Sequence, residues 1–196
     1  MQFLVLGVDG PGFGSDDDLN EAHWSYMDNW ADTLVARGPT RSVAGGHHTG
    51  SVHVVELPDA AAAARFAYEE PYARAGWYST IEVTPLVPCM DGTMWDRPAQ
   101  QPRGVSALVR TSFELTSVTA RDLASSVRRH LDHSGSWCWI FLGITRDDDG
   151  NAAGLMGMAD ASPAAARKRV LELLRAIGLT DPAIETQPWR RGGRPS

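Results

Sequence analysis

Apolar and polar positions alternate along this chain in a way that divides it into two stretches with the same order of elements. In the first stretch, residues 1–10 (MQFLVLGVDG) form a short apolar run, which predicts a strand. Residues 19–37 place apolar side chains at helical spacing, and Gly38 and Pro39 are expected to end that helix. The rest of the stretch predicts a strand, a loop and a strand within 40–57, a helix at 60–69 capped by Asp59, and a closing strand at 78–87.

The second stretch repeats this order. Its pattern predicts strands at 105–115, 137–145, 152–160 and 183–189, and helices at 120–134 and 163–177. Thr119 and Ser162 are expected to cap the two helices, with Pro163 at a first helical position and Gly178 after a helix end. The two closing strands share a skeleton, Ile-Glu-x-x-Pro, at 81–85 and at 184–188. The chain therefore reads as an internal repeat.

A βαββαβ order is the plan of ferredoxin-like domains. One such sheet leaves a face open, and two tandem copies in one chain can cover each other sheet to sheet. We therefore predict an α+β fold with two tandem ferredoxin-like βαββαβ repeats, and we expect the ligand site in the cavity between them. The predicted domains are residues 1–88 and 105–190, joined by a linker at 89–104 and followed by a disordered tail at 191–196.

Composition narrows the class of protein. The chain has 196 residues, of which 43% are hydrophobic and 21% charged, as in ordinary globular proteins. Its net charge of −6 argues against nucleic acid as a partner, because nucleic-acid binders carry a basic stripe. No apolar run approaches the ~20 residues of a membrane span, and the N-terminus has no basic region or cleavage signature. With two cysteines, Cys89 and Cys138, in predicted strand surroundings, we expect a cytoplasmic protein without disulfides.

The first half, roughly residues 1–88, resembles the YciI-like (YCII-related) family. The resemblance is carried by the opening MQFLVL, by His23 within EAHWSYMDNW, by ARGPT and TGSVHVVEL, and by FAYEEPYARAGWYSTIEVTPL at 66–86. It implies a fold similar to the dimeric α+β barrels, so that this chain would form an intramolecular dimeric α+β barrel. It also implies an acid/base pair made of His23 and the acid of an Asp-Pro-Tyr motif, where this chain has Glu70. The second half carries the plan of the fold without the motif.

Glu70 and His23 are the predicted catalytic residues. Glu70 follows an alanine-rich helix and precedes Pro71, which excludes it from regular helix geometry. An acid at a helix C-terminus opposes the helix dipole, so its position there suggests either a solvent-facing residue or a general acid or base. His23 is expected at the edge of the inner face of its helix, as a partner of Glu70 or as a ring bonded to a backbone carbonyl.

Other side chains are candidates for contacts with a substrate. We expect His53 or Tyr72 to hold a substrate oxygen. Most aromatic side chains are expected in the core, and Trp30, Trp137 and Trp139 are the candidates for lining the cavity. Trp137 and Trp139 share one strand face, which stacks either toward a helix layer or toward the cavity. Histidines at 23, 47 and 53 have no matching carboxylate pattern, so we predict no metal site. The glycines at 10, 12 and 14 do not have the GxGxxG spacing of a dinucleotide site, and we predict no cofactor.

These features together suggest a cofactor-independent enzyme that acts on a small carbonyl, enol or phenolic metabolite. The expected chemistry is isomerisation, elimination (lyase) or cyclisation by proton transfer, of the kind found in the biosynthesis of specialised metabolites. The alternatives are a non-catalytic binding protein for a hydrophobic metabolite and a cofactor-free monooxygenase. The expected partner is a small-molecule substrate, with no nucleic acid or membrane, and the chain is expected to be a monomer (a pseudo-dimer) or a homodimer.

Overall fold

The protein is described from a computed structural model, in which residues 1–43, 46–97, 106–113, 115, 117–134, 138–180 and 182–193 are described. The chain divides into two compact units. The first is Met1–Pro85 together with the residues from Arg191 onward, and the second is Leu86–Arg190. Most of the second half of the predicted linker, at 98–104, and the end of the predicted tail, at 194–196, lie outside the described residues.

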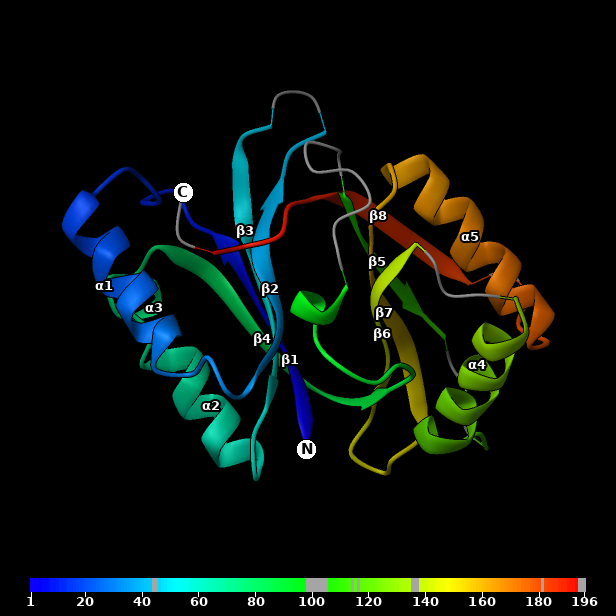
Figure 1. Ribbon diagram of the computed structural model, residues 1–196. Helices are drawn as coiled ribbons and strands as arrows, with labels where there is room; N and C mark the ends of the chain where they lie inside the picture. The colour runs from blue at the N-terminus through cyan, green and yellow to red at the C-terminus, as the bar shows by residue number, and fades with distance from the viewer. Residues whose placement is uncertain are drawn as a thin grey trace. The chain divides into compact units, whose positions relative to one another are not determined.

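The first unit consists of a sheet covered on one face by helices (Figure 1). Its elements are β1 (Gln2–Asp9), α1 (Asp17–Asp28), β2 (Leu34–Arg41), β3 (His48–Glu56), α2 (Ala60–Tyr68), α3 (Pro71–Arg74) and the start of β4 (Tyr78–Pro88). Strand β3 lies between β1 and β2 and is antiparallel to both. The start of β4 lies beside β1, because the amide of Gly10 donates to the carbonyl of Trp77 at 2.7 Å.

Alternation along β1 and β3 produces the core of the first unit. Phe3 and Val5 on β1 and Val55 on β3 face the helices, where they pack against Met27 of α1 and Phe66 of α2. All five side chains are almost fully buried. Removing one large apolar side chain from water stabilises the fold by about 1.5–3 kcal/mol, so this face of the sheet fixes the position of α1 and α2.

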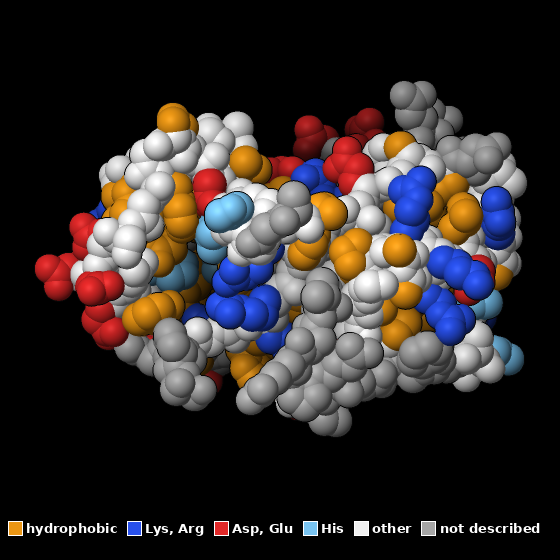
Figure 2. Space-filling model, turned by 90° about the horizontal axis from the view of Figure 1, so that it is seen from above, with side chains coloured by type: hydrophobic (Ala, Val, Ile, Leu, Met, Phe, Trp, Pro, Cys, Tyr) orange, Lys and Arg blue, Asp and Glu red, His pale blue; other side chains and the backbone are white. Residues whose placement is uncertain are grey.

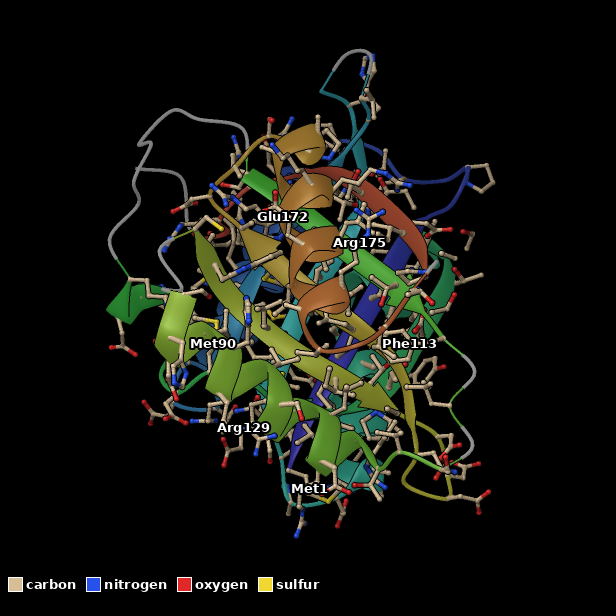
Figure 3. The ribbon with its side chains drawn as sticks, turned by 90° about the vertical axis from the view of Figure 1, so that its right-hand side faces the viewer. Met1, Met90, Phe113, Arg129, Glu172 and Arg175 are labelled. Atoms are coloured by element: carbon tan, nitrogen blue, oxygen red, sulfur yellow. The ribbon has the colours of Figure 1, made fainter. Side chains whose placement is uncertain are left out.

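The second unit repeats the plan with two helices on one face of its sheet (Figure 3). Its further elements are the short helix η1 (Met94–Asp96), β5 (Ser106–Ser112), α4 (Ala120–Ser134), β6 (Trp139–Arg146), β7 (Ala152–Ala159), α5 (Pro163–Ala176) and β8 (Ala183–Trp189). Strand β7 pairs antiparallel with β5 and β6, and β5 also pairs with β8. The end of β4 pairs with β6 at Leu86–Pro88. Figure 3 looks onto the helix layer, which carries Arg129 on α4 and Glu172 on α5.

The two repeats share a close contact that only glycine allows. In the first, a Cβ on Gly50 of β3 would lie 2.2 Å from the carbonyl oxygen of Gly7 on β1. In the second, a Cβ on Gly154 of β7 would lie 2.2 Å from the carbonyl oxygen of Thr111 on β5. In each repeat the third strand therefore approaches the first strand closely at an equivalent glycine. The repeated order of strands and helices in the two units confirms the predicted α+β fold with two tandem ferredoxin-like repeats, and this contact is common to both.

Two helix predictions need correction. The helix expected at 19–37 ends at Asp28, and Leu34–Arg41 is strand β2 instead. Leu34 fits a helical spacing, but the burial of alternate residues from Leu34 to Thr40 has the period of a strand. Helix α3 was also not predicted, because its four residues are too few to show a period. The caps at Asp59 and Ser162 and the glycine after α5 are confirmed; Gly178 has φ of +87°.

Within the described residues, no helix has both the length and the apolar character needed to cross a membrane.

Gly154→Ala tests the shared strand contact. The added methyl group would collide with the carbonyl of Thr111, so we expect the free energy of unfolding to fall by about 1–3 kcal/mol. Urea unfolding followed by circular dichroism measures this change. Gly12→Ala is the control, because a Cβ there meets nothing within 4 Å, and its effect should stay within about 0.5 kcal/mol. Equal unfolding midpoints for both variants would contradict the account of the contact.

Candidate functional site

Glu70 begins a helix rather than ending one. Helix α2 stops at Tyr68, Glu69 is its C-cap, and Glu70 takes an extended conformation with φ −68° and ψ 147°. Pro71 then occupies the first position of α3, and one oxygen of Glu70 (Oε1) accepts a hydrogen bond of 2.8 Å from the amide of Ala73. Glu70 is therefore the N-cap of α3, where a negative charge is favourable. The expectation that it opposes a helix dipole is wrong, because the proline starts a new helix.

The second oxygen of Glu70 holds His23. Nδ1 of His23, on α1, lies 2.8 Å from Oε2 of Glu70, and the side chains are only 11% and 4% exposed. A carboxylate can only accept, so Nδ1 donates, and Nε2 is the ring nitrogen that remains for other chemistry. Charge-assisted hydrogen bonds of this kind are roughly twice as strong as neutral ones. The structure thus brings together the two residues that the sequence predicts as a pair.

Tyr72 fixes the ring of His23 from one side. The two rings are stacked, with centroids 4.1 Å apart and planes 5° apart. The hydroxyl of Tyr72 donates to the side chain of Asn20, which also belongs to α1, at 2.7 Å. Burial, followed by the charges of Glu70 and Asp9, raises the pKa of Tyr72 to about 12. Tyr72 therefore stays protonated near neutral pH and links α3 to α1 beside the histidine.

His53 and Tyr78 share a small cavity with Glu70. The cavity, of about 10 Å³, has room for about one water molecule and lies between β1, β3 and the helices. Burial lowers the pKa of His53 well below its usual value, and the neighbouring charges of His23 and Arg37 lower it further. The ring of His53 is therefore neutral near pH 7.

The hydroxyl of Tyr78 is a polar group that the sequence did not single out. Among the described residues it makes no hydrogen bond of good geometry, although its oxygen is buried. Burial first, and then the charge of Glu70, raise the pKa of Tyr78 well above 10, while the nearby Ser51 hydroxyl partly offsets that rise. Gly7 makes room for this tyrosine, because a Cβ at residue 7 would lie 2.8 Å from the ring. A glycine at residue 7, within an otherwise apolar strand, was the one feature of the sequence that pointed to a bulky neighbour such as Tyr78.

A second acid–histidine pair lies at the end of the same sheet. Nδ1 of His48 lies 2.8 Å from Oδ2 of Asp9, and the ring of Phe13 stacks on His48 with centroids 4.4 Å apart. Phe13 also meets the rings of Tyr72 and Trp77 edge-on, at 5.9 and 5.0 Å. Neither Asp9 nor Phe13 was predicted from the sequence, since Asp9 is the last residue of a strand and Phe13 lies in a loop without periodicity.

Of the three predicted tryptophans, the two that the structure describes lie in hydrophobic layers. Trp30 packs against Phe66 and Tyr26 in the hydrophobic layer of the first unit, with centroids 5.5 and 6.2 Å away. Trp139 belongs to the hydrophobic core of the second unit, and Trp137 lies outside the described residues. The substrate contacts expected of these residues remain predictions.

The packing of Trp139 shows how the second repeat differs from the first. His53 follows Gly50 by three residues, and Gly157 follows Gly154 by the same number, so Gly157 has the place of His53. A Cβ on Gly157 would lie 2.9 Å from the ring of Trp139. An indole therefore fills, in the second repeat, the space that polar side chains line in the first.

The pair and its neighbours lie within one unit. His23, Glu70, His53 and Tyr72 all belong to the first unit. They lie between the sheet of that unit and its own helices α1 and α3. The ligand site expected between the two halves stays a prediction.

Acidic side chains gather at the start of helix α1. Asp16 caps α1 by accepting from the amide of Leu19 at 2.9 Å, and Asp17 and Asp18 follow in the first turn. Figure 2 shows acidic side chains gathered at the edge of the molecule where the first unit carries α1. Within the described part of the chain, no group of three or more His, Cys, Asp or Glu side chains is placed to hold a metal ion.

His53→Gln tests the buried neutral ring. The unfolded chain takes up a proton at residue 53 below about pH 6.5, whereas the buried ring does not, so the native state loses stability as pH falls. We expect the wild-type free energy of unfolding to drop between pH 7 and pH 5 by up to about 1.4 kcal/mol per pH unit more than that of the variant. Urea unfolding at each pH measures the slopes. His47→Gln, which alters an exposed histidine, should keep the wild-type slope; an unchanged slope in His53→Gln would contradict the assignment.

Comparisons with known proteins agree with this fold. The chain is similar to a proposed monooxygenase from Lactobacillus acidophilus NCFM at 12% identity, with a TM-score of 0.56 and coverage of 97% of this chain and 93% of that one. A proposed chlorite dismutase is 13% identical, with a TM-score of 0.52 and coverage of 96% and 94%. Both likenesses span both units and show the fold, that of the dimeric α+β barrel proteins.

A third likeness covers only part of the chain. A 5-chloro-2-hydroxyhydroquinone dehydrochlorinase from Burkholderia phenoliruptrix AC1100 is 26% identical, with a TM-score of 0.40 and coverage of 43% of this chain and 92% of that one. None of the curated proteins compared with the chain matches it. Residues 1–87 match the YCII-related domain family. The N-terminal part of this chain, residues 1–87, is therefore a YCII-related domain, as the sequence around His23 and Glu70 predicts.

Proposed function

We propose that this protein is a cofactor-independent enzyme that moves protons on a small carbonyl, enol or phenolic compound. The observation that carries the proposal is the buried hydrogen bond of 2.8 Å between His23 and Glu70. A carboxylate that orients an imidazole leaves the far nitrogen as a base in a fixed direction, and such pairs recur in acid/base catalysis. Perturbed and buried titratable groups beside this pair support the same reading.

The geometry favours a division of roles between the two residues. Both oxygens of Glu70 are engaged, one with the amide of Ala73 and one with His23, so Glu70 acts as the orienting group. His23 is the more exposed of the two, and its Nε2 has no hydrogen-bond partner among the described residues. His23 is therefore the proposed general base and acid. This reverses the roles expected from the sequence, where Glu70 was to move the proton.

Two uncharged side chains beside the pair, Tyr78 and His53, are suited to donate hydrogen bonds to a substrate oxygen. Tyr78 carries a protonated hydroxyl without a hydrogen bond of good geometry, and His53 carries a neutral ring; both line the cavity beside Glu70. A neutral donor beside a developing enolate or phenolate stabilises the negative charge without a large desolvation penalty. In this proposal Tyr78 and His53 hold the oxygen, and Tyr72 keeps the base in place.

Proton transfer at these groups accounts for three reaction types. Removal of a proton from an O–H, or from a C–H beside a carbonyl, gives an oxyanion that the neutral donors can bind. Return of the proton elsewhere completes an isomerisation, loss of a leaving group completes an elimination, and attack within the molecule closes a ring. Each proton moves between the substrate and the side chains named above, and no electrons are transferred, so the proposed steps need no cofactor.

Substitution of the pair tests this function. The assay incubates a panel of small cyclic ketones, enols and hydroquinones in D₂O and follows exchange and product formation by NMR. If His23 is the base, His23→Asn should lower turnover about 10²-fold or more, and Glu70→Gln should lower it because the ring loses its orienting charge. Glu69→Gln is the matched control, since that neighbouring acid is exposed and should leave turnover unchanged.

Full activity in His23→Asn would remove this residue from the mechanism. Retention of a compound without conversion would favour a binding protein instead, and oxygen consumption during turnover would favour a cofactor-free monooxygenase.

A further inference from the structure

Phe13 occupies a cage of aromatic rings at the side of the site. It lies parallel to His48, with planes 7° apart and centroids 4.4 Å apart, and it meets Tyr72 and Trp77 at steep angles of 76° and 60°. One parallel neighbour and two edge-on neighbours make up the set of contacts that aromatic rings prefer. The hydrogen bond to Asp9 holds the ring of His48 in its orientation, so the cage has a fixed wall.

The loop that carries Phe13 is weakly attached. In the described part of the chain, its hydrogen bonds are those from Gly10 to the Trp77 carbonyl and from Phe13 to the Gly10 carbonyl. Gly12 and Gly14 flank Phe13, and a Cβ on either would meet no atom closer than 3.9 Å. Steric fit therefore does not require glycine at these two positions. What the glycines provide is backbone freedom on both sides of the ring.

The cage adjoins the proposed base. Tyr72 contacts Phe13 edge-on and stacks on His23 with one face. Phe13 and His23 are therefore both neighbours of the same ring, and a group that replaced Phe13 would lie close to the imidazole. The cavity beside Glu70 holds about one water molecule, so a larger substrate cannot enter without displacing a side chain. Phe13 is a partly exposed ring in contact with Tyr72, on a loop with few hydrogen bonds among the described residues.

We propose that Phe13 occupies the binding place of the substrate's planar aromatic ring, and that the Gly10–Gly14 loop swings away to admit it. This inference rests on the proposed function and narrows its substrate to a hydroxylated aromatic compound. Asp9 and Glu70, the acids paired with His48 and His23, lie beside this place and act on Tyr72, which favours a neutral ring over a phosphate or carboxylate. The ring stacks on His48, and its hydroxyl group is directed toward His23.

Phe13→Ala tests the inference, because a substrate that competes with Phe13 should bind more tightly once the ring is removed. Ligand-observed NMR titration with hydroquinone should give a dissociation constant at least about fivefold lower than that of the wild type, since the open cage no longer has to be vacated. Cyclohexane-1,4-diol has the same hydroxyl groups without an aromatic ring and should show no such gain. Trp95→Ala, which removes an exposed aromatic side chain, should leave both constants unchanged.

Weaker or equal hydroquinone binding in Phe13→Ala would overturn the inference, because Phe13 would then be a wall of the site or unrelated to it. A second variant changes only the loop: Gly12→Ala with Gly14→Ala should slow the association of hydroquinone without changing the cage, and wild-type association would count against a swinging loop. The titration is repeated in His23→Asn, where the gain from Phe13→Ala should persist. If hydroquinone binds in the His23→Asn protein but neither the wild type nor any variant converts a compound, the proposed function is refuted and the ring site is not.

Discussion

The carboxylate of Glu70 is the group on which the site depends. One oxygen caps α3 and the other holds His23 on α1, so a single side chain fixes both the start of a helix and the direction of a base. Tyr72, two residues later, completes the arrangement by stacking on that base. Burying a carboxylate is costly unless hydrogen bonds compensate, and here both oxygens have a partner. The short helix Pro71–Arg74 exists in this form because Pro71 prevents α2 from continuing and Glu70 starts a new turn.

The two repeats show how one plan is used in two ways. In each repeat the third strand packs closely against the first strand at a glycine, Gly50 or Gly154. The backbones of the two repeats therefore make an equivalent contact at this point. Beyond it the side chains diverge. The first repeat places His53 beside polar groups, whereas the second has Gly157 there and fills the space with Trp139. An indole has one polar group, its N–H, and no charge to bury, and the second repeat can therefore fill with mostly apolar atoms the space where the first keeps titratable groups.

Much of the fold follows from the sequence, because periodicity, caps and the repeated order specify it; the last strand, Ala183–Trp189, was predicted to the residue. The failure at 19–37 has a local cause: Leu34 satisfies the period of a helix and that of a strand at once. His23, Glu70 and Tyr72 could be predicted because a family motif carries them. Asp9, Phe13 and Tyr78 could not, since they come together only when β1, α3 and β4 are placed in space. Trp30 and Trp139 were expected at the ligand because indoles suit flat compounds; the structure places them in the hydrophobic layers of the two units, and their contacts with a substrate stay predictions.

The position of the proton on His23 tests the central claim most directly. Long-range ¹H–¹⁵N NMR of histidine-labelled protein assigns the protonated nitrogen at a pH where the ring is neutral. If Glu70 orients the base, the proton of His23 should lie on Nδ1, facing the carboxylate, and Glu70→Gln should shift the ring toward a mixture of tautomers. A wild-type ring that carries its proton on Nε2 would contradict the account, because Nε2 would then have no lone pair with which to take a proton from a substrate.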